Sequence, residues 1–247
     1  MKVDVFKNRN IHLWFTNKEL LKQINQLLLE YYKPVEGDVD TSAPGFEAPL
    51  FHQTPARNYG EFFSSPEVAA AVIGRAQMYG REDVCGSYRE QWKPSRVLEP
   101  SAGGGILAEA ARAKGHHVTC VEIQGGHAAM LRRAGFETRE ADFLKLRPSD
   151  FPELFDYVVM NPPFDRGRDC DHVRHAMEFL KPGGTLVSVM SARAEFAEDA
   201  RHKALHALIE RNGGSRYETW QDLPDRSFAH AGTNVNTVML KIIKRRA

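Results

Sequence analysis

The segment Asn161-Pro162-Pro163-Phe164 has the residue types needed to bind a planar amine. It directly follows the run Asp156–Met160, whose apolar character is typical of a buried strand. Two consecutive prolines cannot extend the hydrogen-bond ladder of that strand, and they fix the backbone of the turn. An amide side chain, a backbone carbonyl and an aromatic ring are therefore held together at one sheet edge. We call Asn161–Phe164 the amide tetrad.

A glycine-rich loop lies upstream, where the predicted strand Arg96–Glu99 runs through residues 99–105 (EPSAGGG) into a predicted helix. Glycines at such a crossover let a ligand approach the backbone closely, at the place where doubly wound sheets bind cofactors. The loop by itself is weak evidence, because a plain tight turn has the same composition.

Two acids follow at the ends of the next two predicted strands. Glu122 lies roughly 20 residues beyond the glycines, which is the spacing of an acid that binds ribose hydroxyls. Asp142 comes after the third strand and could accept a hydrogen bond from an adenine amino group, with Phe143 beside the ring. Either acid alone could be a solvated loop residue. Three such features on successive strand ends favour a nucleotide-type cofactor.

In this order, the loop 99–105, Glu122, Asp142 and the amide tetrad resemble the S-adenosylmethionine-dependent amino methyltransferases of nucleic acids. The N6-adenine DNA methyltransferases are the most similar group. The resemblance implies an α/β, Rossmann-like class I fold. Its seven-stranded, mostly parallel sheet would have an antiparallel last strand.

Two further segments resemble parts of the same family. Phe62–Pro66, ahead of a helix, resembles the cofactor-contacting segment of the branch in which the cofactor motif precedes the catalytic one. Lys181–Gly184 resembles the turn before the family's fifth strand. The similarity runs from about residue 60 to the C-terminus.

The resemblance implies S-adenosylmethionine as cofactor and gives each matched residue a role. Glu99 would lie near the methionine amino group, and Gly103 and Gly105 would face the methionine part. The full set of implied cofactor contacts is Phe63, Ser65, Glu99, Ser101, Gly103, Gly105, Glu122, Ile123, Asp142, Phe143 and Asn161.

The catalytic residues implied are Asn161, Pro162, Pro163 and Phe164. Asn161 and the Pro162 carbonyl would accept hydrogen bonds from the target amine, which favours a pyramidal nitrogen and aims its lone pair at the methyl group. Because a base inside a duplex cannot reach such a pocket, it would be flipped out, with Phe164 replacing its lost stacking. The implied substrate contacts are Phe164, Arg166, Arg168, Arg226 and Phe228.

The predicted reaction is therefore methylation of the N6 amino group of adenine in DNA, either duplex with a flipped base or single-stranded. RNA adenine N6 or guanine N2 remains an alternative, because the tetrad occurs in those families too. A protein glutamine amide is disfavoured, since that family usually has tyrosine at the place of Phe164. A non-catalytic module that binds the cofactor or DNA is a further alternative. We expect no metal, because His172 and His175 lack a suitably spaced third ligand and a packing or solvent role is favoured for both.

The elements that position these residues alternate between strand and helix, which predicts a parallel sheet with helices on both faces. We expect residues 1–33 to form a hairpin-helix module, 34–59 a linker and 60–247 the methyltransferase domain. The predicted strands are Val3–Phe6, Ile11–Phe15, Arg96–Glu99, His117–Ile123, Phe136–Arg139, Tyr157–Met160, Thr185–Met190, Arg216–Thr219 and Val235–Ile243. The predicted helices are Gly104–Lys114, His127–Ala134, Asp171–Leu180 and Asp199–Arg211.

Composition sets broader bounds. The net charge of +1 neither favours nor opposes nucleic acid. No apolar run is long enough to span a bilayer, no signal peptide is evident, and three cysteines are widely spaced, so we expect a cytoplasmic protein without a membrane partner. The N-terminal hairpin resembles a module found ahead of methyltransferase domains in bacterial phage and plasmid proteins. We expect no large C-terminal target-recognition domain, and the sequence leaves the oligomeric state open.

Overall fold

A computed structural model describes residues 2–5, 11–14, 64–223 and 237–246 of the 247-residue chain. The chain divides into two compact units, residues 1–54 and 55–247. In the first unit, β1 (Lys2–Val5) and β2 (Ile11–Trp14) form an antiparallel hairpin. This agrees with the two strands predicted at the N-terminus. The helix predicted after them lies outside the described residues, and the proposed boundaries at 33 and 59 stay predictions.

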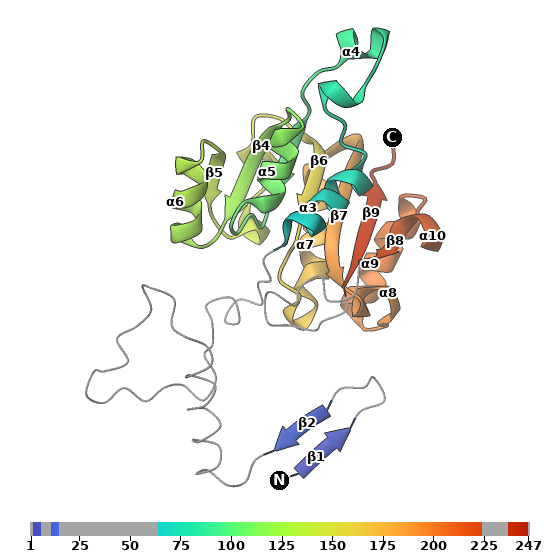
Figure 1. Cartoon of the computed structure of the whole chain (residues 1–247). Helices are drawn as coiled ribbons and strands as arrows, with labels where there is room; N and C mark the ends of the chain where they lie inside the picture. Colours follow the sequence, from blue (N-terminus) through green and yellow to red (C-terminus); the bar gives the residue numbers. More distant parts are fainter. Residues whose placement is uncertain (1, 6–10, 15–63, 224–236, 247) are drawn as a thin grey trace, which may run out of the picture. The chain divides into compact units, whose positions relative to one another are not determined.

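The second unit contains a seven-stranded sheet in the order β5-β4-β3-β6-β7-β9-β8 (Figure 1). Five neighbouring strands, from β5 to β7, run parallel, whereas β9 is antiparallel to both β7 and β8. The predicted α/β Rossmann-like sheet with an antiparallel last strand is therefore confirmed. The strands are β3 (Arg96–Glu99), β4 (His117–Glu122), β5 (Glu137–Glu140), β6 (Phe155–Met160), β7 (Leu180–Ser191), β8 (Trp220–Asp222) and β9 (Thr237–Ile243).

Helices cover both faces of this sheet, with α3 and α5 on one face and α7 and α9 on the other (Figure 1). The α-helices are α3 (Pro66–Ala76), α4 (Ser87–Gln91), α5 (Ile106–Ala113), α6 (Gly125–Arg133), α7 (Arg168–Ala176), α8 (Arg193–Phe196), α9 (Ala200–Arg211) and α10 (Arg216–Thr219). Short 3-10 turns are η1 (Arg81–Asp83), η2 (Phe143–Lys145), η3 (Pro148–Asp150), η4 (Asp165–Gly167) and η5 (Met177–Phe179).

The alternation of side chains along each strand divides the apolar core into two layers. In β3, Val97 packs with the α3 and α5 layer, and its neighbour Leu98 packs with the α7 and α9 layer. Val187 and Leu186 divide in the same way in β7. Strands buried on both faces read as continuous apolar runs, which is why the sequence marks them clearly.

One predicted strand is wrong. Arg216–Thr219 forms the helical turn α10, and the strand β8 begins only at Trp220. The backbone N–H groups of Glu218 and Thr219 both donate to the Ser215 carbonyl, and the Ser215 hydroxyl donates to the Glu218 carboxylate. Serine followed three residues later by glutamate is typical of a helix N-terminus, and this local signal overrides the strand-like alternation.

The segment Lys181–Gly184 also differs from the turn expected there. Strand β7 already pairs at Leu180, and its register against β6 shifts before Thr185. Gly183 has φ of 82° and donates its N–H to the Lys244 carbonyl. A Cβ on Gly184 would lie 2.9 Å from the Lys181 carbonyl oxygen, so glycine is needed at this close approach.

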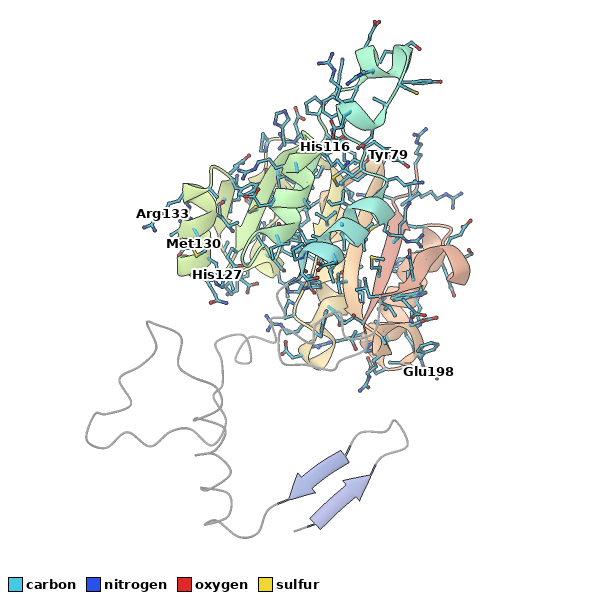
Figure 2. The ribbon with its side chains drawn as sticks, viewed as in Figure 1. Tyr79, His116, His127, Met130, Arg133 and Glu198 are labelled. Carbon is cyan, nitrogen blue, oxygen red and sulfur yellow. The ribbon has the colours of Figure 1, made fainter. Side chains whose placement is uncertain are left out.

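The carboxyl ends of the parallel strands lie at one edge of the sheet. Figure 2 shows Tyr79 and His116 at the opposite, amino end, and Glu198, which follows β7, at the carboxyl end. Loops at the carboxyl edge can therefore meet over the strand ends. No helix in the described part of the chain is long and apolar enough to cross a bilayer.

Candidate active site

The glycine loop after β3 turns sharply because two of its glycines have left-handed backbones. Gly103 has φ of 49°, and Gly105, the residue before α5, has φ of 82°. A Cβ on Gly105 would lie 2.6 Å from Leu131 Cδ2, so a larger residue would force that side chain to shift as well as strain the left-handed backbone. The sequence uses glycine here to bring the loop close to the strand ends.

Glu122, at the end of β4, fixes this loop. Its carboxylate accepts one hydrogen bond from the Gly103 N–H and another from the Gln124 N–H, each at 2.7 Å. The side chain is buried. Each carboxylate oxygen keeps a lone pair beyond these bonds, so the group can still accept from ribose hydroxyls. Glu122 thus combines a structural contact with the predicted ligand contact.

A cavity opens above the ends of β3, β4, β5 and β6, and we call it the cofactor cavity. Most of the residues predicted to bind the cofactor line it, although they come from four separate strand ends. They are Glu99, Ser101, Gly103, Glu122, Ile123, Asp142, Phe143 and Asn161, and Pro163 of the amide tetrad lines it too.

The two predicted cofactor contacts ahead of α3, Phe63 and Ser65, are not among the residues that line the cofactor cavity in the described part of the chain. Ser65 is the N-cap of α3, and its hydroxyl accepts from the Val68 N–H at 3.3 Å. The neighbouring Ser64 is the one that lines the cavity, is buried, and accepts from Asn161 Nδ2 at 3.0 Å. Phe63 lies outside the described residues. The resemblance of Phe62–Pro66 located the right segment. Which of its two serines faces the cavity depends on which of them caps the helix.

Asp142 and Phe143 hold the cavity wall after β5. Asp142 accepts a hydrogen bond from the Leu144 N–H at 3.1 Å and so caps η2. Phe143 is buried and packs against Phe179, with ring centroids 5.0 Å apart. Both side chains are thereby fixed where a purine ring could lie beside them.

Glu99 is buried at the floor of the cavity, where only 2% of it is exposed. Burial raises the pKa of its carboxyl well above the ordinary value of 4.5, the nearby Glu122 adds to the rise, and the Ala108 N–H opposes it. Its Oε2 atom has no hydrogen-bond partner within the described residues. An acid buried beside a glycine loop with an unused oxygen fits the ammonium group of S-adenosylmethionine.

Replacing Glu99 by glutamine is expected to stabilise the ligand-free protein at alkaline pH. Since the folded-state pKa is raised, the wild-type protein loses stability as pH rises from about 4.5 through that higher value, and the amide removes this loss. Urea unfolding of both proteins at pH 5 and pH 8 measures the difference, which should widen at pH 8. Cofactor affinity should fall by about tenfold, because a charge-assisted hydrogen bond is lost. A difference in stability that is equal at both pH values would contradict the assignment.

The amide tetrad separates the cofactor cavity from a second cavity. Asn161 and Pro163 line the first, whereas Phe164 lines the second, and Pro162 between them is buried. The second cavity lies between the end of β7 and the starts of α7 and α9. Its other lining residues include Gly167, Asp169, Ser191, Arg193, Asp199, Arg201 and His202.

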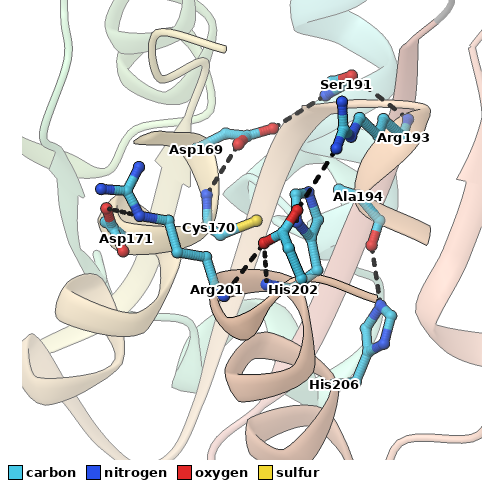
Figure 3. Close-up of polar contacts among 10 residues, drawn as sticks. Asp169, Cys170, Asp171, Ser191, Arg193, Ala194, Arg201, His202 and His206 are labelled. Carbon is cyan, nitrogen blue, oxygen red and sulfur yellow. Dashed lines mark hydrogen bonds and ion pairs between the residues drawn. The ribbon is translucent and has the colours of Figure 1, made fainter. Parts of the chain in front are cut away.

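Asp169 ties the elements around the second cavity together (Figure 3). It is buried, and its two oxygens accept from the Cys170 N–H at 3.0 Å and the Ser191 N–H at 3.2 Å. Burial raises the pKa of its carboxyl, and these two N–H groups limit the rise. Asp199 caps α9, and its Oδ2 atom lies 2.7 Å from His202 Nδ1. The rim of the cavity therefore has a defined, hydrogen-bonded geometry.

The predicted substrate contacts are only partly described. Arg168 lines the cofactor cavity and pairs with Asp165 at 3.6 Å, so the structure places it on the cofactor side of the tetrad. Residues 165–167 form the 3-10 turn η4 directly after the amide tetrad. The side chain of Arg166, and Arg226 and Phe228 entirely, lie outside the described residues.

Two histidines of α7 have different surroundings. His175 Nε2 lies within 3.1 Å of the carbonyls of Phe143 and Leu146, a packing role as expected. His172 lines the cofactor cavity, which sequence reasoning missed. His172 lies four residues after Arg168, a predicted site residue, and residues at this spacing share one face of a helix. This spacing was the signal in the sequence that could have placed His172 at the site. The described residues contain no group of three or more His, Cys, Asp or Glu side chains placed to hold a metal ion.

Comparisons with known proteins agree with this geometry. The family model of the methyltransferase small domain matches residues 89–212, which is half of the chain. A ubiquinone biosynthesis O-methyltransferase of Xylella fastidiosa is 26% identical over 191 residues, covering 61% of this chain and 74% of that protein.

Solved structures show the same fold at low identity. A Listeria monocytogenes protein described as a class I S-adenosylmethionine-dependent methyltransferase superposes with a TM-score of 0.54 at 14% identity, covering 94% of this chain and 70% of that one. A chain from a type I R-M system superposes with a TM-score of 0.54 at 18% identity, covering 78% and 44%. The glycine loop, Glu99 and Glu122 meet in one cavity, and the family model covers half of the chain. The chain therefore belongs to the methyltransferase small domain family, and its cofactor is S-adenosylmethionine.

Proposed function

We propose that this protein transfers a methyl group from S-adenosylmethionine to the N6 amino group of adenine in DNA. The observation that carries the proposal is the position of the amide tetrad between two cavities. Asn161 lies on the cofactor side and Phe164 on the other side of the same short, proline-fixed turn. An amine held at Asn161 would therefore belong to a ring stacked on Phe164.

The chemistry requires alignment more than acid or base strength. Bound S-adenosylmethionine supplies an electrophilic methyl group on a sulfonium that leaves readily. The lone pair of an exocyclic amine is delocalised, and acceptors at Asn161 Oδ1 and the Pro162 carbonyl would restore it by favouring a pyramidal nitrogen. The amine lone pair forms the new N–C bond, the S–C electron pair stays on sulfur, and the excess proton passes to water.

Ser64 supports this role of Asn161. The Asn161 amide nitrogen donates to the buried Ser64 hydroxyl at 3.0 Å, which fixes the plane of the amide. With the nitrogen committed to this bond, the oxygen is the end of the amide that can accept from a target amine. Methylation would then depend on a pair of residues from distant parts of the chain.

The acceptor atom favoured by this site is nitrogen. The Xylella fastidiosa relative is named an O-methyltransferase. A hydroxyl acceptor must lose its proton to a nearby base as the methyl group arrives. Asn161 carries no charge and cannot take that proton, whereas an amine attacks with its own lone pair.

The surroundings of the second cavity support a nucleic-acid substrate. Arg193 lies 3.5 Å from Asp199, and Arg201 lies 3.4 Å from Asp171, both as ion pairs near the surface (Figure 3). Exposed pairs of this kind contribute little to stability, so the guanidinium groups can exchange a carboxylate for a phosphate at small cost. A flipped or single-stranded base on Phe164 would bring its phosphates to this rim.

The test is incubation with labelled S-adenosylmethionine and, separately, duplex DNA, single-stranded DNA, RNA, protein extract and small phenols. Digestion and mass spectrometry then identify the product. We expect N6-methyladenine in at least one DNA sample. Methylated bases in RNA alone would move the proposal to RNA. Label confined to protein or to a phenol oxygen would overturn it.

A further inference from the structure

His172 is a buried, chemically competent side chain to which the proposed reaction gives no role. It is only 5% exposed, it lies on α7, and it lines the cofactor cavity. Its Nδ1 atom lies 3.4 Å from the Ser101 hydroxyl oxygen. Its Nε2 atom is buried and has no hydrogen-bond partner within the part of the chain that the structure describes.

An unpartnered ring nitrogen in such a position points to a ligand. Buried polar atoms in folded proteins nearly always have a hydrogen-bond partner. A side chain that only filled space here would be expected to be apolar, as its neighbours Cys170, Val173 and Ala176 on the same helix are. The atom therefore has the features of a contact completed when the cavity is filled.

The location of His172 indicates which part of the cofactor it would meet. Its ring centroid lies 5.9 Å from that of Phe143, which follows β5, while Ser101 follows β3. Strand β4, which ends in Glu122, lies between those two strands. A ribose held at Glu122 and an adenine beside Phe143 would place the adenosine half of the cofactor next to His172.

We propose that His172 binds the adenosine half of S-adenosylmethionine through Nε2, while the contact between Nδ1 and Ser101 holds the ring in position. The Ser101 hydroxyl can either donate or accept, so it can stabilise either neutral tautomer of the ring. Adenosine offers acceptors at its ring nitrogens and donors at its amino and hydroxyl groups. The inference needs the cofactor only and is independent of the proposed DNA substrate.

The charge state of the ring suits this contact. Burial, together with the charge of the nearby Arg168, lowers the pKa of His172 to about 4, so the imidazole is neutral near pH 7. A neutral ring does not repel the sulfonium and ammonium charges of the cofactor. It also has both a donor and an acceptor nitrogen, as a bridge between Ser101 and a ligand requires.

Two substitutions distinguish the contributions of the two ring nitrogens to cofactor affinity. The amide of His172→Asn can reach the place of Nδ1, whereas the amide of His172→Gln can reach that of Nε2. Calorimetric titration with S-adenosylhomocysteine should show affinity about tenfold weaker for His172→Asn and within about threefold of wild type for His172→Gln. His206→Asn is the matched control, because His206 lies on α9 and its Nε2 atom contacts the Ala194 carbonyl of α8. The affinity of this variant for S-adenosylhomocysteine should not change.

A fragment of the cofactor tests the assignment to adenosine. His172→Asn should weaken the affinity for 5′-methylthioadenosine, which lacks the amino-acid part, by the same factor as that for S-adenosylhomocysteine. A loss seen only with S-adenosylhomocysteine would overturn the adenosine assignment. Equal affinities of the Asn and Gln variants, or no loss in either, would overturn the contact itself.

A measurement on the unaltered protein does not depend on whether the variants fold. In ¹⁵N-histidine-labelled wild-type protein, the Nε2 resonance of His172 should shift when S-adenosylhomocysteine is added, while that of His206 should stay in place. A His172 resonance that does not move at saturating ligand would overturn the proposal. Failure to methylate DNA would leave both readouts unaffected, so the two proposals fail separately.

Discussion

Replacing Asn161 by alanine is expected to lower the rate of methyl transfer by about 100- to 1000-fold, the range seen when one aligned hydrogen-bonding group is removed from a preorganised site. The loss should appear in single turnovers at saturating S-adenosylmethionine, because the amide acts on the amine and not on the supply of methyl groups. The rate is measured on whichever substrate the labelling experiment identifies.

Two related variants serve as controls for that experiment. Asn161→Asp keeps an acceptor oxygen and should retain more activity than the alanine variant. Ser64→Ala removes the hydroxyl that accepts from the Asn161 amide at 3.0 Å, and about a tenfold loss is expected because the amide plane is released. A rate for Asn161→Ala within threefold of wild type would mean that another group aligns the amine.

Replacing Glu122 by alanine is expected to weaken cofactor binding by about 100-fold or more. The carboxylate holds the Gly103 and Gln124 N–H groups at 2.7 Å, so its loss would release the glycine loop as well as remove the ribose contact. A charge-assisted hydrogen bond contributes about 1.5–3 kcal/mol. The alanine variant loses the two bonds to the loop and also the contacts that the carboxylate is proposed to make with the ligand. Titration calorimetry with S-adenosylhomocysteine measures the affinity, and thermal unfolding measures the accompanying loss of stability.

Glu122→Gln is the informative companion to that variant. Its amide keeps one acceptor oxygen but places an NH₂ group against one of the two backbone N–H donors. We expect an affinity between those of the wild type and the alanine variant. If the alanine variant binds S-adenosylhomocysteine as well as wild type does, Glu122 is a loop anchor with no part in the cofactor site.

The parts predicted well from sequence are those fixed by strand ends. Glu99 and Glu122 end the buried strands β3 and β4, whose apolar runs are easily recognised, and Asp142 follows the polar edge strand β5. Parallel strands bring their carboxyl ends to one edge. Knowing the strands therefore places these acids near one another without any knowledge of the packing. The amide tetrad was located for the same reason, directly after β6.

The errors arise where tertiary packing or a short local signal decides. Proline at the first position of α3 makes Ser65 the cap, and the direction of Ser64 into the cavity depends on how the segment before the helix packs. His172 lies beside the apolar positions of a short helix, so its direction toward the cavity depends on how that helix packs. The helical turn Arg216–Thr219 has an alternating pattern that resembles a strand, and only the cap at Ser215 signals the turn.

The position of β9 in the sheet has a consequence for how the chain folds during its synthesis on the ribosome. It lies between β7 and β8, although it is made after both, and among the described strands β8 pairs with β9 alone. The cofactor side of the sheet, from β5 to β6, can assemble from earlier residues while synthesis continues. Until β9 emerges, the growing chain leaves one edge of β7 unpaired along the mostly apolar run Leu186–Met190, which is buried in the folded protein. The nascent chain thus has an unpaired strand edge that could pair with another chain until β9 is made and pairs with β7.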